Sequence, residues 1–163
     1  MPSQDSPVRR ATSGDRPVSD DSGRYKRPES VLVVVHTRAG EVLLLRRVEP
    51  RGWWQSVTGS LEPGETPREA AVRELEEETG LAADGLVDLG LRQRFPILPA
   101  WRVRYAPGVT ENVEHAFALG LAARQVVRLN PAEHAEHVWL LRNKAIERAS
   151  SYTDRAAIKA IYA

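Results

Sequence analysis

A glycine turn that runs directly into a short acidic helix constrains this chain more than any other feature. Within residues 59–81, the glutamates Glu74, Glu77 and Glu78 are spaced at i, i+3 and i+4. Residues at that spacing share one face of an α-helix and lie within a turn of each other. Like charges this close repel, and oxygen ligands suit a hard cation such as Mg²⁺ or Mn²⁺. The segment therefore predicts a metal site for chemistry on phosphates.

The flanking residues predict where this helix begins and ends. Thr66 is the expected N-cap, with Pro67 in the first turn and Glu69 three residues on. Gly80 fits the left-handed position that ends a helix. The side expected to pack on a sheet carries Ala70, Ala71, Leu75 and, at its margin, Val72. We interpret the side of the helix that carries the glutamates as exposed to solvent.

Extended segments precede and follow the helix. The β-branched run at 30–37 predicts a buried strand, and the turn at 38–40 predicts a hairpin with a second strand at 41–47. Further extended segments are expected at 52–58, 86–94, 101–105, 114–121, 125–129 and 136–141, before a helical region from about residue 142. This irregular alternation predicts an α/β fold in which helices flank a mixed sheet.

Composition narrows the class of protein. The chain has 163 residues, of which 42% are apolar and 28% charged, as expected of one globular domain at 25–163. Residues 1–24 hold few large apolar side chains, so we expect a disordered tail there. The net charge of +1 offers no electrostatic case for nucleic acid or a membrane, and the absence of cysteine excludes disulfides and thiolate catalysis. The sequence has no apolar run long enough to span a membrane and no signal peptide, so we expect a cytoplasmic protein. We expect it to act on a small molecule, and its oligomeric state is left open.

The acidic segment resembles the signature of the Nudix hydrolases. The signature's defined positions are filled by Gly59, Glu65, Arg73, Glu74, Leu75, Glu77, Glu78, Gly80 and Leu81. A merely solvated acidic helix would not account for the glycines together with the distant Glu65. The resemblance implies the Nudix α/β/α sandwich and hydrolysis of a diphosphate linked to another group.

The same resemblance implies roles for single residues. Glu74 and Glu78 would be metal ligands, and Glu77 a further ligand or a partner through water. Glu133 would complete the metal site from a loop distant in sequence. Arg73 would orient the catalytic carboxylates through charge-assisted hydrogen bonds. The group that removes the proton from water is left open between a glutamate of the segment and Glu133.

Beyond the signature, the chain resembles one branch of the family, the bacterial enzymes that hydrolyse dihydroneopterin triphosphate in folate synthesis. The similarity is carried by residues 25–28, 54–60, 104–110, 133–134, 139–140 and 151–158. It implies Mg²⁺-dependent hydrolysis of 7,8-dihydroneopterin 3′-triphosphate to the monophosphate and pyrophosphate. The substrate contacts that it implies are Lys26, Arg46, Thr58, the segment Phe95, Pro96, Ile97 and Leu98, and Ser151. The basic pair Lys26 and Arg46 suits a triphosphate, while Phe95 could form an apolar wall for the flat pterin ring.

Two alternatives stay open. One is a broader (deoxy)nucleoside triphosphate pyrophosphohydrolase that uses the same site. The other is a Nudix domain that binds a nucleotide as a sensor without catalysis, although no carboxylate of the signature is lost here. Two histidines near Glu133, His134 and His137, are interpreted as surface residues or as neighbours of the site rather than as metal ligands.

Overall fold

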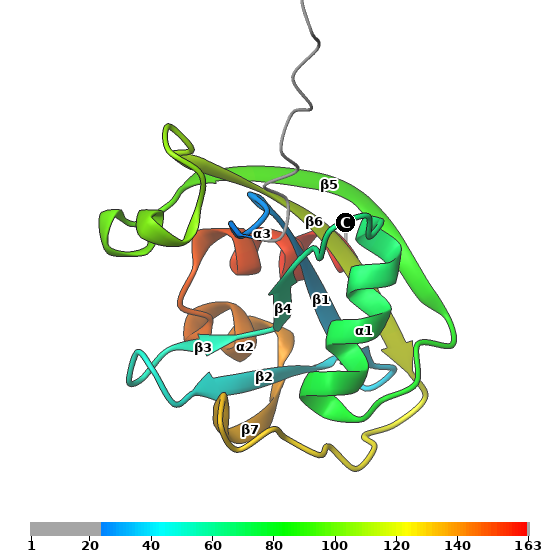
Figure 1. Cartoon of the computed structure of the whole chain (residues 1–163). Coiled ribbons are helices and arrows are strands. Elements are labelled where there is room, and N and C mark those ends of the chain that lie inside the picture. The colour runs from blue at the N-terminus through cyan, green and yellow to red at the C-terminus, as the bar shows by residue number, and fades with distance from the viewer. Residues whose placement is uncertain (1–23, 163) are drawn as a thin grey trace, which may run out of the picture.

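A computed structural model describes residues 24–162 of the chain (Figure 1). The expected disordered tail, 1–24, lies outside the described residues apart from Arg24. The strands are β1 (Glu29–Thr37), β2 (Glu41–Arg47), β3 (Trp54–Gln55), β4 (Val57–Ser60), β5 (Leu86–Pro96), β6 (Glu111–Leu121) and β7 (His134–Leu141). The helices are α1 (Pro67–Thr79), α2 (Arg142–Arg148), α3 (Tyr152–Ile161) and the short 3₁₀ helix η2 (Pro99–Arg104).

All seven strands join one mixed sheet. Its main path runs β3-β2-β1-β6-β5, with β4 also paired to β1 and β7 to β2. The pair β1 and β6 is parallel, and every other pair in the described chain is antiparallel. The strands β4 and β2 share one edge of β1: β4 pairs with residues 30–33, whereas β2 pairs at His36.

Helices cover both faces of the sheet, because β1 is apolar on both. Val31, Val33 and Val35 pack in the cluster that contains the α1 residue Leu75. The alternate residues, such as Leu32, pack in a second cluster with residues of α2 and α3. Figure 1 shows α1 on one side of the sheet and α2 and α3 on the other. The α/β/α sandwich expected from the sequence is confirmed.

The ends of α1 are capped as predicted. The Thr66 hydroxyl accepts a hydrogen bond from the Glu69 N–H at 3.2 Å, and Gly80 has a left-handed φ of 72°. The expected packing residues Ala70, Ala71 and Leu75 are buried, whereas Val72, the marginal member of that face, is 38% exposed. The idea of a solvent-lined carboxylate face was wrong for Glu78, which is only 3% exposed.

Three expected strands differ in the structure. The segment 101–105 is not a strand. Its residues 101–104 belong to η2, where Pro99 starts a 3₁₀ turn and the Trp101 N–H donates to the Leu98 carbonyl. The segment 125–129 forms no strand. Its Arg128 N–H donates to the Thr79 carbonyl, and Val127 and Leu129 pack against the core on the α1 side. The segment 52–58 divides into β3 and the start of β4, because the Ser56 N–H donates to the Asp154 carboxylate instead of to a strand.

Among the described residues, none of the helices has both the length and the apolar character that crossing a membrane requires.

Candidate active site

The strand β4 and the helix α1 approach so closely that a side chain at Gly59 would not fit. A Cβ atom there would overlap the carboxyl group of Glu74. One residue earlier, the Thr58 N–H donates to Glu78 Oε2 at 3.2 Å. The glycine therefore lets two carboxylates of α1 reach the edge of β4.

Arg73 binds the turn to the helix. Its Nε and Nη2 donate to the two carboxylate oxygens of Glu65, each at 2.8 Å, in a bidentate pair. Its Nη1 donates to Glu74 Oε1 at 2.7 Å, and Nη2 also donates to the Ser60 carbonyl at 3.0 Å. The hydrogen bond from Arg73 is the main reason that the pKa of Glu65 is lowered. These contacts agree with the orienting role expected for Arg73, while Glu77 stays at the margin at 3.4 Å.

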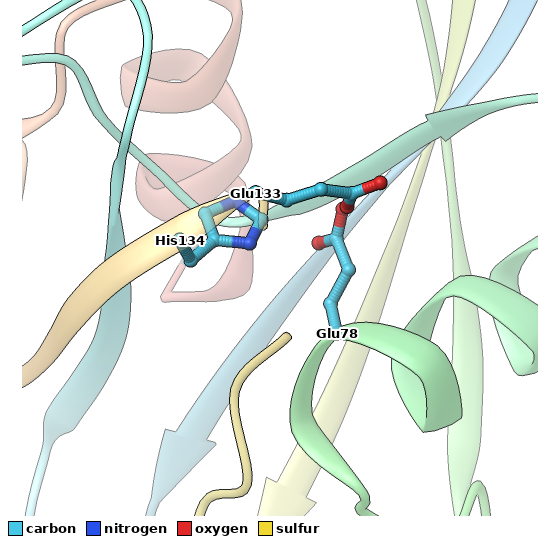
Figure 2. Close-up of side chains that lie close together, drawn as sticks. All are labelled: Glu78, Glu133 and His134. Carbon is cyan, nitrogen blue, oxygen red and sulfur yellow. The ribbon is translucent and has the colours of Figure 1, made fainter. Parts of the chain in front are cut away.

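A cluster of possible metal ligands forms where α1 meets the start of β7. One ligand atom each from Glu78, Glu133 and His134 lies within 4.8 Å of the others. Figure 2 shows the two carboxylates pointing toward each other with the imidazole beside them. Glu133 is held there because its carbonyl accepts a hydrogen bond from the Val48 N–H at 2.9 Å. A loop distant in sequence thus reaches the signature helix, as the resemblance implied.

The charges of this cluster fit a divalent cation. Burial, followed by the charge of Glu74, raises the pKa of Glu78 well above its usual value, and Glu133 adds to the effect. Burial is also the largest cause of the raised pKa of Glu74, which Glu77 and Glu133 raise further. Carboxylates that disfavour one another's charge gain from a cation placed among them, and oxygen donors suit Mg²⁺ or Mn²⁺.

His134 is not a surface residue, contrary to one of the two interpretations from the sequence. Its side chain is buried, its Nδ1 has no hydrogen-bond partner, and its Nε2 lies 3.4 Å from the amide nitrogen of Gln55. Burial and the nearby Arg47 lower its pKa to about 4, so the ring is neutral at pH 7. His137 is exposed, as one of those interpretations expected.

A cationic pocket of about 360 Å³ lies near the acidic cluster. Its lining consists of Lys26, Arg47, Glu49, Pro50, Trp101, Arg104 and Tyr105. The Lys26 N–H donates to the Arg104 carbonyl at 2.8 Å, which holds the segment before β1 against η2. Burial and then the charges of Arg104 and Arg47 lower the pKa of Lys26, whereas Glu74 raises it. Cations that repel one another in this way favour a polyanionic ligand.

The other expected substrate contacts lie outside this pocket. Arg46 forms an ion pair with Glu136 at 3.0 Å. The Thr58 hydroxyl donates to the Val31 carbonyl, and the Ser151 hydroxyl caps α3 by accepting from the Asp154 N–H. In the segment Phe95, Pro96, Ile97 and Leu98, Phe95 is half-buried, Ile97 is buried, and Pro96 and Leu98 are exposed.

Sequence reasoning passed over Arg47, although a signal for it was present. Leu43 and Leu45 face α1, and side chains alternate along a strand, so the next residue on that face is Arg47 and not Arg46. Trp101, Arg104 and Tyr105 carried no such signal, because their position depends on how η2 folds against the segment before β1.

Comparisons with known proteins show the family of this chain. The protein-family model of the NUDIX domain matches residues 26–160. A dihydroneopterin triphosphate diphosphatase of Escherichia coli is 41% identical over 141 residues, which cover 83% of this chain and 92% of that protein. The enzyme of the same name from Haemophilus influenzae is 38% identical over 141 residues, covering 83% and 88%.

A solved structure shares the fold. The E. coli dihydroneopterin triphosphate pyrophosphohydrolase superposes with a TM-score of 0.78 at 39% identity, covering 85% of this chain and 99% of that one. The family match spans the signature, the segment before β1 that carries Lys26, and the loop that carries Glu133. The chain belongs to the Nudix hydrolase family.

Proposed function

We propose that this protein hydrolyses 7,8-dihydroneopterin 3′-triphosphate to dihydroneopterin monophosphate and pyrophosphate in folate synthesis. The observation that carries the proposal is the pairing of an acidic cluster at Glu78 and Glu133 with a pocket lined by three cations. The first element suits a divalent cation and the second a polyphosphate. The similarity to two enzymes named for this substrate supports the choice among Nudix substrates.

Glu74, Glu78 and Glu133 would hold Mg²⁺, with Glu77 as a further ligand or a partner through water. When bound, the ion neutralises negative charge that gathers on the phosphate oxygens and lowers the pKa of water. The role of Arg73 is to hold Glu74 and Glu65 in place, since its guanidinium contacts both. Mn²⁺ would fit the same ligands.

The cationic pocket would take the end of the triphosphate that leaves as pyrophosphate. Lys26 lies close enough to α1 for the charge of Glu74 to raise the pKa of Lys26. One substrate can therefore contact both the cationic pocket and the acidic cluster. Arg47 lies near Glu78 and, unlike Arg46, lines the pocket. The remaining proposed contacts, Thr58, Phe95–Leu98 and Ser151, would then serve the pterin end.

In the reaction, the oxygen of water forms a bond to phosphorus while the bond to the bridging oxygen of the leaving pyrophosphate breaks. A carboxylate takes the proton of the water. Glu77 and Glu133 are the candidates, because both side chains are exposed to solvent beside the buried Glu78. Their positions leave the choice between them to experiment.

A substrate panel at equal Mg²⁺ concentration tests the proposal. The expected result is a higher kcat/KM for dihydroneopterin triphosphate than for dATP, dCTP, dGTP or dTTP. A higher value for a common deoxynucleotide would replace the proposal with a broader nucleoside triphosphate pyrophosphohydrolase. Tight nucleotide binding without release of pyrophosphate, with either Mg²⁺ or Mn²⁺, would instead indicate a sensor.

A further inference from the structure

One row of side chains interrupts the apolar sheet face that α3 covers. Across β4, β1, β6 and β5, the register places Ser60, Ser30, Glu114 and Gln93 side by side. The next row along the same face holds the apolar Leu32, Ala116 and Leu91, all in the cluster beneath α3. A polar row inside an apolar face requires polar partners, because burying polar groups without them is unfavourable.

Two oxygen atoms near this row lack such partners. Glu114 is 5% exposed and Asn112 is 2% exposed, yet Glu114 Oε1 and Asn112 Oδ1 accept no hydrogen bond. The nitrogen of the same Asn112 amide does have a hydrogen-bond partner, since Nδ2 donates to Ser30 Oγ at 2.7 Å. Buried polar atoms nearly always have a partner, so two unpartnered acceptors on the same face of β6 call for donors from outside the described chain.

The surroundings of the row are held in place. The Gln93 side-chain amide donates to the Thr153 carbonyl at 2.8 Å, and the Ser56 hydroxyl donates to Asp154 at 2.7 Å. Both contacts fix the start of α3 over the row. The ends of the row are less covered than its centre, since Ser60 and Gln93 are half-buried whereas Ser30 and Glu114 are buried.

The row begins on β4, the strand that contacts α1, although its side chains face α3 on the opposite side of the sheet (Figure 1). Thr58, whose N–H binds Glu78, is two residues from Ser60, the first member of the row. Strands lie about 4.8 Å apart, so Glu114 is roughly 10 Å across the sheet from β4. Phe95 pairs with Asn112 in register and offers a flat apolar surface at the same place.

We propose that Glu114 and Asn112 recognise the hydrogen-donating edge of the substrate's heterocycle, the 2-amino group and the adjacent ring N–H of a 2-amino-pyrimidinone. This inference rests on the proposed function and names the residues that read its substrate. A carboxylate offers only acceptors and can take both donors of that edge side by side. Guanine carries the same edge as the pterin, whereas hypoxanthine lacks the 2-amino group.

The test compares dGTP, dITP and dATP in the wild-type protein and in Glu114→Gln. The wild type is expected to show a kcat/KM for dGTP about tenfold or more above that for dITP, since each lost hydrogen bond to a charged group costs about 1.5–3 kcal/mol. Glu114→Gln is expected to lower kcat/KM most for dGTP, less for dITP, which keeps the ring N–H, and least for dATP, so that the preference for dGTP over dITP shrinks. The matched control is Glu111→Gln, the same change at an exposed position of β6.

Equal values for dGTP and dITP in the wild type would overturn the inference, and would indicate that buried water satisfies the two oxygens. An equal loss for all three nucleotides in Glu114→Gln would also overturn it, because that result indicates a structural role. If this variant does not fold, the wild-type comparison of dGTP with dITP decides alone.

Titration calorimetry with dGTP and dITP separates this inference from the proposed function. A higher affinity for dGTP than for dITP, without hydrolysis of either nucleotide, would count against the proposed function and support the recognition role of Glu114. Turnover without discrimination would support a hydrolase and contradict that role.

Discussion

The carboxylate of Glu78 connects the helix, the sheet and the loop that brings Glu133. It is buried, accepts a hydrogen bond from the Thr58 N–H, and lies within 4.8 Å of ligand atoms on Glu133 and His134. A neutral side chain of the same shape would keep the contact with Thr58 but could not hold a cation as well.

Glu78→Gln is therefore expected to lower kcat by about a hundredfold or more, the effect of losing one preorganised charge-stabilising group. The melting temperature without metal is expected to hold or rise, because a neutral amide is easier to bury than a carboxylate among carboxylates. Steady-state kinetics and thermal unfolding measure the two effects. A fully active variant would exclude Glu78 from the metal site.

Glu114 makes stability depend on pH. Burial raises the pKa of Glu114 from 4.5 to about 7. A hydrogen bond with the Thr153 side chain lowers this pKa by a smaller amount. Between these values the folded protein keeps a proton that the unfolded chain releases, so the free energy of unfolding falls as the pH rises. Above pH 7 both states are ionised and the loss is complete, at about 3 kcal/mol.

Glu114→Gln removes this titration. Relative to the wild type, the variant is expected to gain about 3 kcal/mol of unfolding free energy between pH 4 and pH 8. Urea titrations of both proteins at several pH values measure the difference, in which other titrating groups cancel. A constant difference across that range would show that Glu114 is ionised at every pH tested.

The helix α1 and the strand β4 act as one unit, since glycine is the only residue type that fits at position 59 beside Glu74. Gly59→Ala would push the Glu74 carboxyl group aside and disturb its hydrogen bond with Arg73. A displacement of about 1 Å can cost a hundredfold in rate, so kcat/KM is expected to fall by about that factor.

Gly90→Ala provides the control. It adds a side chain at a φ of 66° with no atom within 4 Å, and is expected to cost about 1 kcal/mol of stability without a change in kcat/KM. Comparable losses of activity in both variants would show that Gly59 acts through stability and not through Glu74.

The elements that the sequence predicted well are those whose signals are local. The helix α1 is bounded by Thr66 and Gly80, and β1 by its β-branched run. The segment 101–105 became a 3₁₀ helix, and 52–58 broke at Ser56, because Pro99 and the distant Asp154 decide the backbone there. The acidic signature could be placed from its spacing, whereas the pocket could not, since its walls come together only in the folded chain.

Three segments distant in sequence form the cationic pocket. Lys26 precedes β1, Arg47 ends β2, and Arg104 ends η2. The neighbours Arg46 and Arg47 have different surroundings. Arg46 forms an ion pair with Glu136, whereas Arg47 lines the pocket. This pair gives a matched test of which arginine binds the triphosphate.

Arg47→Ala is expected to raise KM for a triphosphate substrate by about tenfold, the effect of one lost charge-assisted hydrogen bond. Arg46→Ala is expected to change KM by less than about twofold, as an exposed ion pair contributes little. The opposite pattern, with the larger effect at Arg46, would show that Arg46 is the substrate contact and that the pocket is not used.

Identification of the reaction products decides whether the clustered glutamates cleave a pterin triphosphate with the help of a divalent cation. Dihydroneopterin triphosphate is incubated with the protein and Mg²⁺, and the products are followed by phosphorus NMR with and without a chelator. Pyrophosphate and the monophosphate are expected in equal amounts, with no reaction in the presence of the chelator and recovery when Mg²⁺ is restored. Orthophosphate as the first product, or hydrolysis that the chelator does not affect, would contradict this expectation.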